Sequence, residues 1–154
     1  MKYAGEMILI ISTTGLGIYL SGKSKQKIII CRDLISLCDG LLLDLNYKIT
    51  PAGELIESIV ESRKLESLKF IGKNCLIRQK KIDSPLSDSD NKEVSSFLFM
   101  FGKSDVETQK KLVSNFRENI NISLKKYTDK HSKDSKLYIT FGLFSGLIVS
   151  IIWS

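Results

Sequence analysis

The sequence predicts an all-α membrane protein, in which transmembrane helices at the N- and C-terminal ends bracket a cytoplasmic helical bundle. Three observations lead to this fold class. Each end of the chain carries an uncharged apolar segment, apolar residues between these segments recur at helical spacing, and no segment shows the alternation that is typical of a strand. Three parts follow: an N-terminal transmembrane helix at 1–22, a basic cytoplasmic helical domain at 23–136 and a C-terminal transmembrane helix at 137–154.

The first and last parts have the composition of membrane spans. Residues 7–20 read MILIISTTGLGIYL and residues 137–154 read LYITFGLFSGLIVSIIWS, and neither segment contains a charged residue. Both are short for a span but within the accepted range. Gly142 and Gly146 form a GxxxG pattern, which lets helices approach closely in lipid. We expect these glycines to form a helix-packing face, either between the two spans or between protomers of a homo-oligomer.

The distribution of charge predicts the orientation of the chain. Lys and Arg number 23 against 17 Asp and Glu, which gives a formal net charge of +6. All basic residues except Lys2 lie between Lys23 and Lys136, so lysines follow the first span and precede the second. Because basic residues are retained on the cytoplasmic side, we expect a cytoplasmic central domain with both termini outside. The same lysines suit contact with membrane lipids.

The central domain is expected to begin with an amphipathic helix over 28–45, where apolar residues recur every seven positions on adjacent rows. This helix should stop near Tyr47, because Thr50 and Pro51 have the pattern of a new helix start. Thr50 is expected to be the N-cap and Pro51 the first helical residue. The second helix should end near Arg63, and its apolar face consists of Leu55, Ile56, Ile59 and Val60.

The next two segments are expected to form a third and a fourth helix. Residues 65–81 suit a helix, with Gly72 as its weak point, and residues 82–91 (IDSPLSDSDN) form a polar, turn-rich break. Residues 92–101 then predict a short helix that ends at Gly102. Its inward-facing residues are Val94, Phe97, Leu98 and Phe101.

The last helix has a recognisable start. Ser104 is expected to cap it, and Glu107 three residues later completes a capping box. Asp105 places a negative charge in the first turn, where the helix dipole favours it. The helix can run on into the second span without a break, and its buried stripe is Val113, Phe116, Ile120, Leu124 and Tyr127.

The sequence offers no set of residues for catalysis, cofactor binding or metal binding. Its three cysteines, Cys31, Cys38 and Cys75, form no CxxC pair, and there is a single histidine. Cys31 and Cys38 occupy core positions of the first predicted helix. No nucleophile–base pair, Gly-rich phosphate loop or HExxH pattern occurs, and the lysines lack the interleaved aromatic residues of a nucleic-acid surface. We therefore expect a protein that is neither an enzyme nor a nucleic-acid binder.

Three stretches of sequence resemble a known family. They are LLLDLNYKITPAGEL, FLFMFGKSDVETQKKLV and FGLFSGLIVSIIW, in this order. The most specific parts are YKITP at 47–51 and FGKSDVETQ at 101–109. With these motifs, the chain resembles the stage III sporulation protein AB family of endospore-forming bacteria. The resemblance extends over the whole chain and is weakest in 65–94.

The resemblance implies a role as well as a fold. The family is similar to the F platform protein of type II secretion and type IV pilus machines, a cytoplasmic helical bundle linked to membrane helices. It implies a scaffold in an export-like channel complex between mother cell and forespore, placed in the outer forespore membrane with its domain on the mother-cell side. The expected partners are other stage III sporulation proteins, including a cytoplasmic ATPase.

Five residues of the two motifs are candidates for partner contact: Thr50, Pro51, Asp105, Glu107 and Gln109. Each also has a simpler interpretation, since caps and helix starts account for most of them. Two other functions are alternatives to the platform role. A small pore or holin-like protein would need polar faces on its spans, and a lipid-surface binding module would use the basic flanks and weaken with salt.

Overall fold

All described elements of the computed structural model are helices, which confirms the predicted all-α fold class. The structure describes the backbone of residues 2–47, 50–71 and 74–153. It describes the side chains of residues 22–47, 50–71, 75–134, 136–137, 140 and 144. The elements in order are α1 (Lys2–Tyr47), α2 (Ala52–Ser62), the 3₁₀ turn η1 (Glu66–Leu68), α3 (Asn74–Ile77), α4 (Asp88–Lys103) and α5 (Val106–Trp153).

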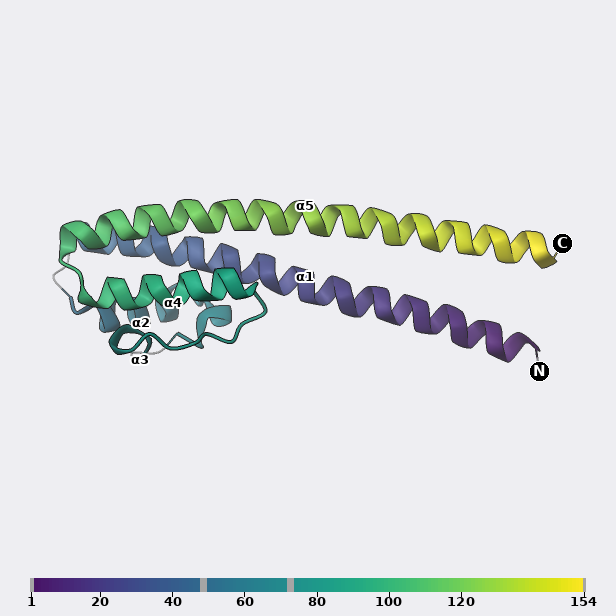
Figure 1. Cartoon of the computed structure of the whole chain (residues 1–154), viewed down its shortest axis with the longest axis horizontal. Coiled ribbons are helices and arrows are strands. Elements are labelled where there is room, and N and C mark those ends of the chain that lie inside the picture. The colour runs from purple at the N-terminus through teal and green to yellow at the C-terminus, as the bar shows by residue number, and fades with distance from the viewer. Residues whose placement is uncertain (1, 48–49, 72–73, 154) are drawn as a thin grey trace.

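Two long helices determine the shape of the molecule. α1 and α5 run antiparallel along its long axis, and both extend beyond the bundle on the same side, so the two termini lie at one end (Figure 1). The shorter helices α2, α3 and α4 pack beside this pair at the other end. The two predicted spans, with Gly142 and Gly146, fall mostly on residues whose side chains are outside the description. Among the residues that are described, no helix is both long and apolar enough to cross a bilayer.

The core lies where the apolar stripes of α1, α4 and α5 meet. Cys31, Cys38 and Leu41 of α1 are fully buried, as is Ile120 of α5. Phe97 of α4 stacks on Phe116 of α5, with ring centroids 4.1 Å apart and planes 4° apart. Each buried side chain of this size contributes about 1.5–3 kcal/mol to folding. The predicted inward faces of 28–45, 92–101 and the last helix are therefore confirmed.

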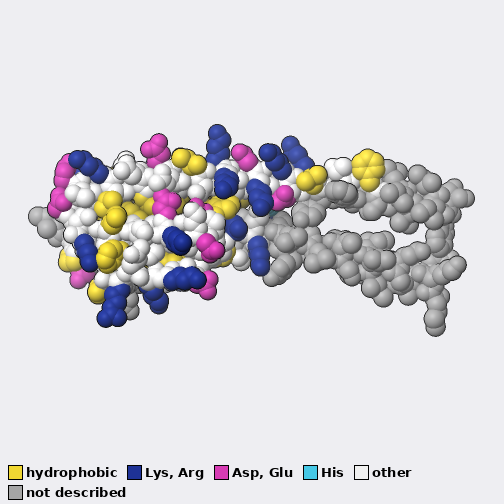
Figure 2. All heavy atoms as spheres, viewed as in Figure 1, with side chains coloured by type: hydrophobic (Ala, Val, Ile, Leu, Met, Phe, Trp, Pro, Cys, Tyr) yellow, Lys and Arg dark blue, Asp and Glu magenta, His cyan; other side chains and the backbone are white. Residues whose placement is uncertain are grey.

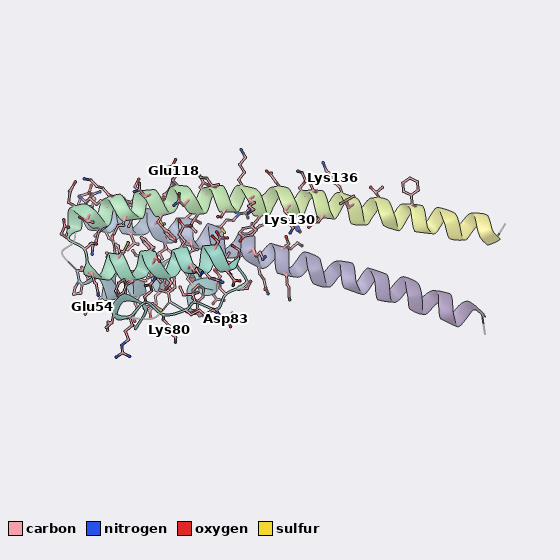
Figure 3. All side chains as sticks on the ribbon, viewed as in Figure 1. Glu54, Lys80, Asp83, Glu118, Lys130 and Lys136 are labelled. Atoms are coloured by element: carbon pink, nitrogen blue, oxygen red, sulfur yellow. The ribbon has the colours of Figure 1, made fainter. Side chains whose placement is uncertain are left out.

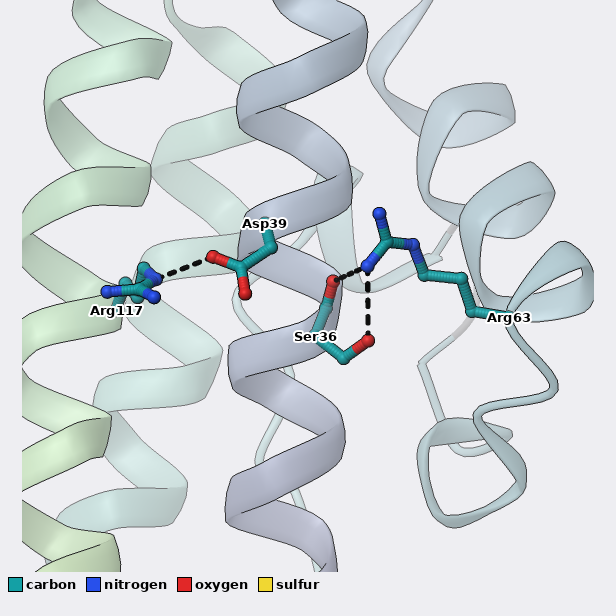
Figure 4. A network of polar contacts seen from close by, with 4 residues as sticks. All are labelled: Ser36, Asp39, Arg63 and Arg117. Carbon is teal, nitrogen blue, oxygen red and sulfur yellow. Dashed lines mark hydrogen bonds and ion pairs between the residues drawn. The ribbon is translucent and has the colours of Figure 1, made fainter.

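Polar contacts connect α1 to the elements on either side of it (Figure 4). Arg117 of α5 donates from Nε to Oδ1 of Asp39 at 2.6 Å, forming an ion pair between half-exposed side chains. On the other side, Arg63 donates to the carbonyl oxygen of Ser36 at 3.1 Å and to its hydroxyl at 3.3 Å. α1 is thus held to α5 and to the end of α2 at nearly the same level.

The predicted helix over 65–81 is wrong, because the chain is turned away from a helical path before it starts. Lys64 adopts a left-handed backbone conformation with φ of 52°. Its amide donates to the carbonyl of Glu61 at 3.2 Å, and the Leu65 amide donates to that of Val60 at 2.9 Å. This pair of bonds is a Schellman motif, which terminates α2. Among the described residues of 65–81, the helical elements are the turn η1 and the four-residue α3.

Phe70 and Ile77 of this segment are exposed, but its other described apolar residues are buried. The buried residues reach the core from two short helical turns instead of one helix face, and they include Leu68, Ile71, Cys75 and Leu76. α3 packs on α4, and η1 packs on α1. The helical spacing of these four residues therefore agrees with their burial, but over so short a stretch it did not predict the backbone path.

α4 is longer than predicted at both ends. It begins at Asp88, four residues before the expected start, because Ser87 caps it: the Asp90 amide donates to Oγ of Ser87 at 3.2 Å. It also continues through Gly102, which does not adopt the left-handed conformation expected of a stop. A β-carbon at Gly102 would lie 2.8 Å from the carbonyl oxygen of Leu76. Gly102 is therefore required for close packing of α3 on α4.

Two predicted helix caps are wrong by one residue. Pro51, not Thr50, is the N-cap of α2, and its carbonyl accepts the first helical hydrogen bond, from the Leu55 amide at 3.0 Å. Ser104 ends α4 instead of starting α5: its backbone is extended at the C-cap of α4, and its hydroxyl donates to the carbonyl of Met100 at 2.7 Å. The expected capping box of Ser104 with Glu107 is therefore not formed, and Asp105 caps α5.

Burial predicts that two of the cysteines are chemically inert in the folded protein. Desolvation raises the pKa of the Cys31 thiol to about 12, with Asp90 adding to the effect, and burial with the nearby Asp39 raises that of Cys38 to about 12. Because the thiolate is the reactive form, we expect neither residue to be alkylated by iodoacetamide at pH 8 without denaturant. Mass spectrometry should find both fully labelled in urea. Rapid labelling of either in the native chain contradicts this packing.

Candidate functional site

The two sequence motifs come together at one end of the molecule. YKITP begins at the last residue of α1 and extends along the α1–α2 turn to Pro51 before α2, and the α4–α5 turn lies within FGKSDVETQ. Both turns lie at the end opposite the two termini (Figure 1). We call this the distal end. The fold thus gathers four of the five candidate contact residues around one pair of turns, although the two pairs are at least 54 positions apart in the sequence. The fifth, Gln109, follows one helical turn into α5.

Asp105 at the distal end combines a capping role with an exposed charge. Its carboxylate accepts hydrogen bonds from the Thr108 hydroxyl at 2.6 Å and from the Thr108 amide at 3.3 Å. Its carbonyl accepts the Gln109 amide at 2.8 Å. The Thr108 hydroxyl and amide hold the pKa of the Asp105 carboxyl below its ordinary value. Asp105 therefore remains ionised at the surface, next to the exposed Glu107.

Gln109 occupies a different environment from its motif neighbours. Its side chain is buried, with 9% exposed, and Nε2 donates to the carbonyl of Phe101 at 2.8 Å. This carbonyl lies in the last turn of α4, where it has no partner along the helix. Gln109 therefore joins the end of α4 to the start of α5 and positions the turn between them. Its side chain does not belong to the exposed surface.

The α1–α2 turn presents a mixed surface. Pro51 is exposed and Thr50 is half-buried. The aromatic ring of Tyr47, the last residue of α1, is 85% exposed. On the neighbouring turn, Val106 begins α5 and is also exposed. Large apolar side chains that are exposed on neighbouring turns make this end a candidate contact surface.

Tyr47 and Val106 were missed as site residues by sequence reasoning. Tyr47 belongs to the YKITP motif, but the sequence indicates only a helix end there. Val106 follows Asp105 inside the second motif, and its pattern position does not distinguish a buried from an exposed valine. The described exposed apolar side chains near the distal end include Leu43, Tyr47, Met100 and Val106.

A second polar cluster lies at the opposite end of α4. Asp90 is 91% buried and accepts hydrogen bonds from three hydroxyl groups: Ser87 at 2.7 Å, Ser123 at 3.0 Å and Tyr127. The Ser87 amide in turn donates to the Tyr127 oxygen at 3.1 Å. Burial raises the pKa of Asp90, but the three hydroxyls and the charge of Lys126 together hold it below its ordinary value. The start of α4 is thereby joined to α5.

Comparison with known families settles the membership of the chain. The family model for stage III sporulation protein AB matches residues 66–153, which is more than half of the sequence. The chain belongs to the stage III sporulation protein AB family. Membership of this family implies a role in sporulation. No curated protein and no solved structure gives a significant match.

The family match covers one of the two motifs of this stage III sporulation protein AB family member and not the other. FGKSDVETQ and the terminal FGLFSGLIVSIIW lie inside the matched residues, and so does the 66–94 segment, where the motif resemblance is weakest. YKITP lies before the match begins. The α4–α5 turn and the Asp90 cluster therefore lie within the residues that the family model matches.

Proposed function

We propose that this protein is a platform component of a stage III sporulation complex, anchored in the membrane by both ends of the chain. Its distal end receives a cytoplasmic ATPase, and the bundle acts as a scaffold without catalysis of its own. The outer forespore membrane, with the domain in the mother-cell cytoplasm, is the proposed location. The observation that carries this proposal is the family match together with the gathering of both motif turns at the distal end.

The register of α1 against α5 supports anchoring by both ends. We refer to residues 7–20 as the first apolar segment and to 137–154 as the second. From the Asp39–Arg117 pair, these segments begin 19 residues away along α1 and 20 along α5. From Lys27, which lies 5.3 Å from the Tyr127 ring, they begin 7 and 10 residues away. At about 1.5 Å per residue, both segments start within about one helical turn of a common level, as two helices entering one membrane require.

The chemistry of the distal end supports a protein partner. Tyr47 and Val106 supply exposed apolar surface, and Asp105 and Glu107 supply negative charge beside it. Interfaces combine an aromatic anchor with a polar rim. The distal end also points away from the membrane level defined by the apolar segments, so a large cytoplasmic assembly meets no steric barrier there.

The test is affinity purification of the tagged full-length chain from sporulating cells in mild detergent, with mass spectrometry of the proteins that accompany it. The wild-type chain should recover an ATPase and other sporulation proteins. A triple variant, Tyr47→Gln, Val106→Glu and Asp105→Ser, should lower ATPase recovery at least about tenfold. Serine preserves the cap, and glutamate in the first turn is favourable to the helix, so α5 should still form.

A matched variant away from the distal end controls for general effects. Ile122→Gln with Glu118→Gln removes an exposed apolar side chain and a charge from the side of α5. Glu118 lies well away from the α4–α5 turn (Figure 3). Equal loss of ATPase in both variants contradicts docking at the distal end. Recovery of the wild-type chain alone, as small homo-oligomers, contradicts the platform role. If these oligomers also release dye from lipid vesicles, the pore alternative is favoured.

A further inference from the structure

Lysines are concentrated where the two long helices leave the bundle. On the side that faces the bundle, within seven residues of the apolar segments, α1 and α5 carry six lysines and one aspartate, Asp134. We call these six the basic collar: Lys23, Lys25, Lys27, Lys130, Lys133 and Lys136. All are exposed except Lys27, which is half-buried over the Tyr127 ring. Figure 2 shows Lys and Arg side chains gathered at this end of the described surface, and Figure 3 shows Lys130 and Lys136 where α5 extends beyond the bundle.

The collar lies at a defined height above the apolar segments. At a rise of about 1.5 Å per residue, the α1 lysines stand about 4–10 Å from the first segment and the α5 lysines about 2–10 Å from the second. This range matches the depth of a headgroup layer and the screening length of about 8 Å at physiological salt. Long lysine side chains can also extend along the helix toward an interface.

We infer that the basic collar binds the headgroups of anionic phospholipids and so enriches these lipids around the protein. The inference rests on the membrane anchoring proposed above. Two observations support it: six positive charges against one negative charge, and a common level on two helices that pack together. A lysine near a membrane surface attracts acidic lipid electrostatically. Among the described side chains of the collar region, no exposed aromatic residue stands beside the lysines to stack nucleic-acid bases, and the large exposed apolar side chains are Ile29 and Leu137.

The distribution of acidic residues favours lipid over other polyanions. Toward the bundle along α5, Lys125 and Lys126 stand beside Asp129, and these three residues line a surface depression that continues to the collar residues Lys130 and Lys133 and to Asp134. In the collar itself, at 21–27 and 130–136, the one acidic residue is Asp134. The positive charge is therefore densest nearest to the proposed membrane level, which is the position a lipid headgroup occupies.

The experiment uses native mass spectrometry of the full-length chain in detergent, titrated with equimolar dioleoylphosphatidylglycerol and dioleoylphosphatidylcholine. The wild-type chain should retain the anionic lipid preferentially. A collar variant, Lys23→Gln, Lys25→Gln, Lys133→Gln and Lys136→Gln, should reduce the ratio of bound anionic to zwitterionic lipid by at least about tenfold. Raising the salt from about 0.1 to about 0.5 M should reduce the wild-type ratio in the same direction.

The control variant removes the same number of charges from elsewhere: Lys64→Gln, Lys69→Gln, Lys110→Gln and Lys111→Gln. An unchanged ratio in this control supports the collar, whereas equal loss in both variants overturns it. A second outcome also overturns the proposal: the collar variant loses binding of a short oligonucleotide, but its lipid ratio stays the same as that of the wild type. Release of the wild-type chain from membranes by alkaline carbonate contradicts the anchoring itself. A chain that resists carbonate but shows no lipid preference contradicts only the collar.

Discussion

Replacement of Asp90 by asparagine is expected to lower the free energy of unfolding of the full-length chain by about 2 kcal/mol at pH 7. Asp90 accepts hydrogen bonds from Ser87, Ser123 and Tyr127 in a nearly buried position. Hydrogen bonds to a charged acceptor contribute about 1.5–3 kcal/mol each when intact. Asparagine keeps the shape but loses the charge, and its amide hydrogens face hydroxyl groups that are already oriented as donors.

The loss should depend on pH in a defined direction. The pKa of Asp90 in the folded protein is below its ordinary value, which is about 3.9 in an unfolded chain. The contribution of the carboxylate is therefore complete above about pH 4 and is lost as the pH falls through the folded-state pKa. The difference between wild type and Asp90→Asn should be constant from pH 5 to 7 and shrink below pH 4.

Urea titrations of both proteins in the same detergent, at several pH values, measure this difference. Asp88→Asn is the matched control, because Asp88 lies in the same first turn of α4 but is exposed. It should cost only about 0.3–1 kcal/mol, through the helix dipole. Equal destabilisation by the two variants contradicts a specific role for the hydroxyl cluster around Asp90.

The Asp90 cluster also shows what the sequence could reveal about local structure. Ser87 and Asp90 have the spacing of a capping box ahead of an apolar run, so the true start of α4 was readable. The polar composition of 82–91 instead predicted a loop through Asn91. Residues 82–87 do form an irregular segment, and its end is fixed by the cap. A short capping pattern thus locates the start of a helix better than the average polarity of the segment does.

The long helices were predictable because an apolar stripe that repeats at helical spacing over several turns can be buried on one side only if the chain is helical. Over 28–45 and along α5, the stripe repeats for several turns, and burying it requires a helix. Over 65–81 the same spacing lasts only a few residues. There, packing on α1 and α4 decides the backbone path, and Lys64 breaks α2 in a conformation that is uncommon for lysine.

The candidate site was only partly accessible to sequence reasoning. The exposure of Asp105 and Glu107 followed from their place at a helix start. The burial of Gln109 depends on the Phe101 carbonyl, which reaches it only once α4 and α5 fold back on each other. Likewise, the exposure of Tyr47 depends on which neighbours the fold places beside the end of α1. Such properties arise from contacts between distant segments, which a single sequence does not specify.

Replacement of Gly102 by alanine is expected to destabilise the protein by about 1–3 kcal/mol, although alanine favours helices over glycine by about 1 kcal/mol. The new β-carbon would lie 2.8 Å from the carbonyl oxygen of Leu76 and 3.0 Å from its β-carbon. Backbone atoms cannot move aside by changing rotamer. α3 must therefore shift away from α4, which disturbs the burial of Cys75 and Leu76 at their contact.

Two other helical glycines make a graded series with Gly102. At Gly40 a β-carbon would meet Cγ2 of Ile59 at 2.7 Å, a side-chain atom, whereas at Gly22 it would meet nothing within 4 Å. We expect alanine to be most destabilising at position 102, less so at 40, and stabilising by up to about 1 kcal/mol at 22. Urea midpoints of the three variants in one detergent give the order directly. A stabilising Gly102→Ala means that α3 does not pack closely on α4, and the glycine then acts only as a helix-weakening residue near the distal end.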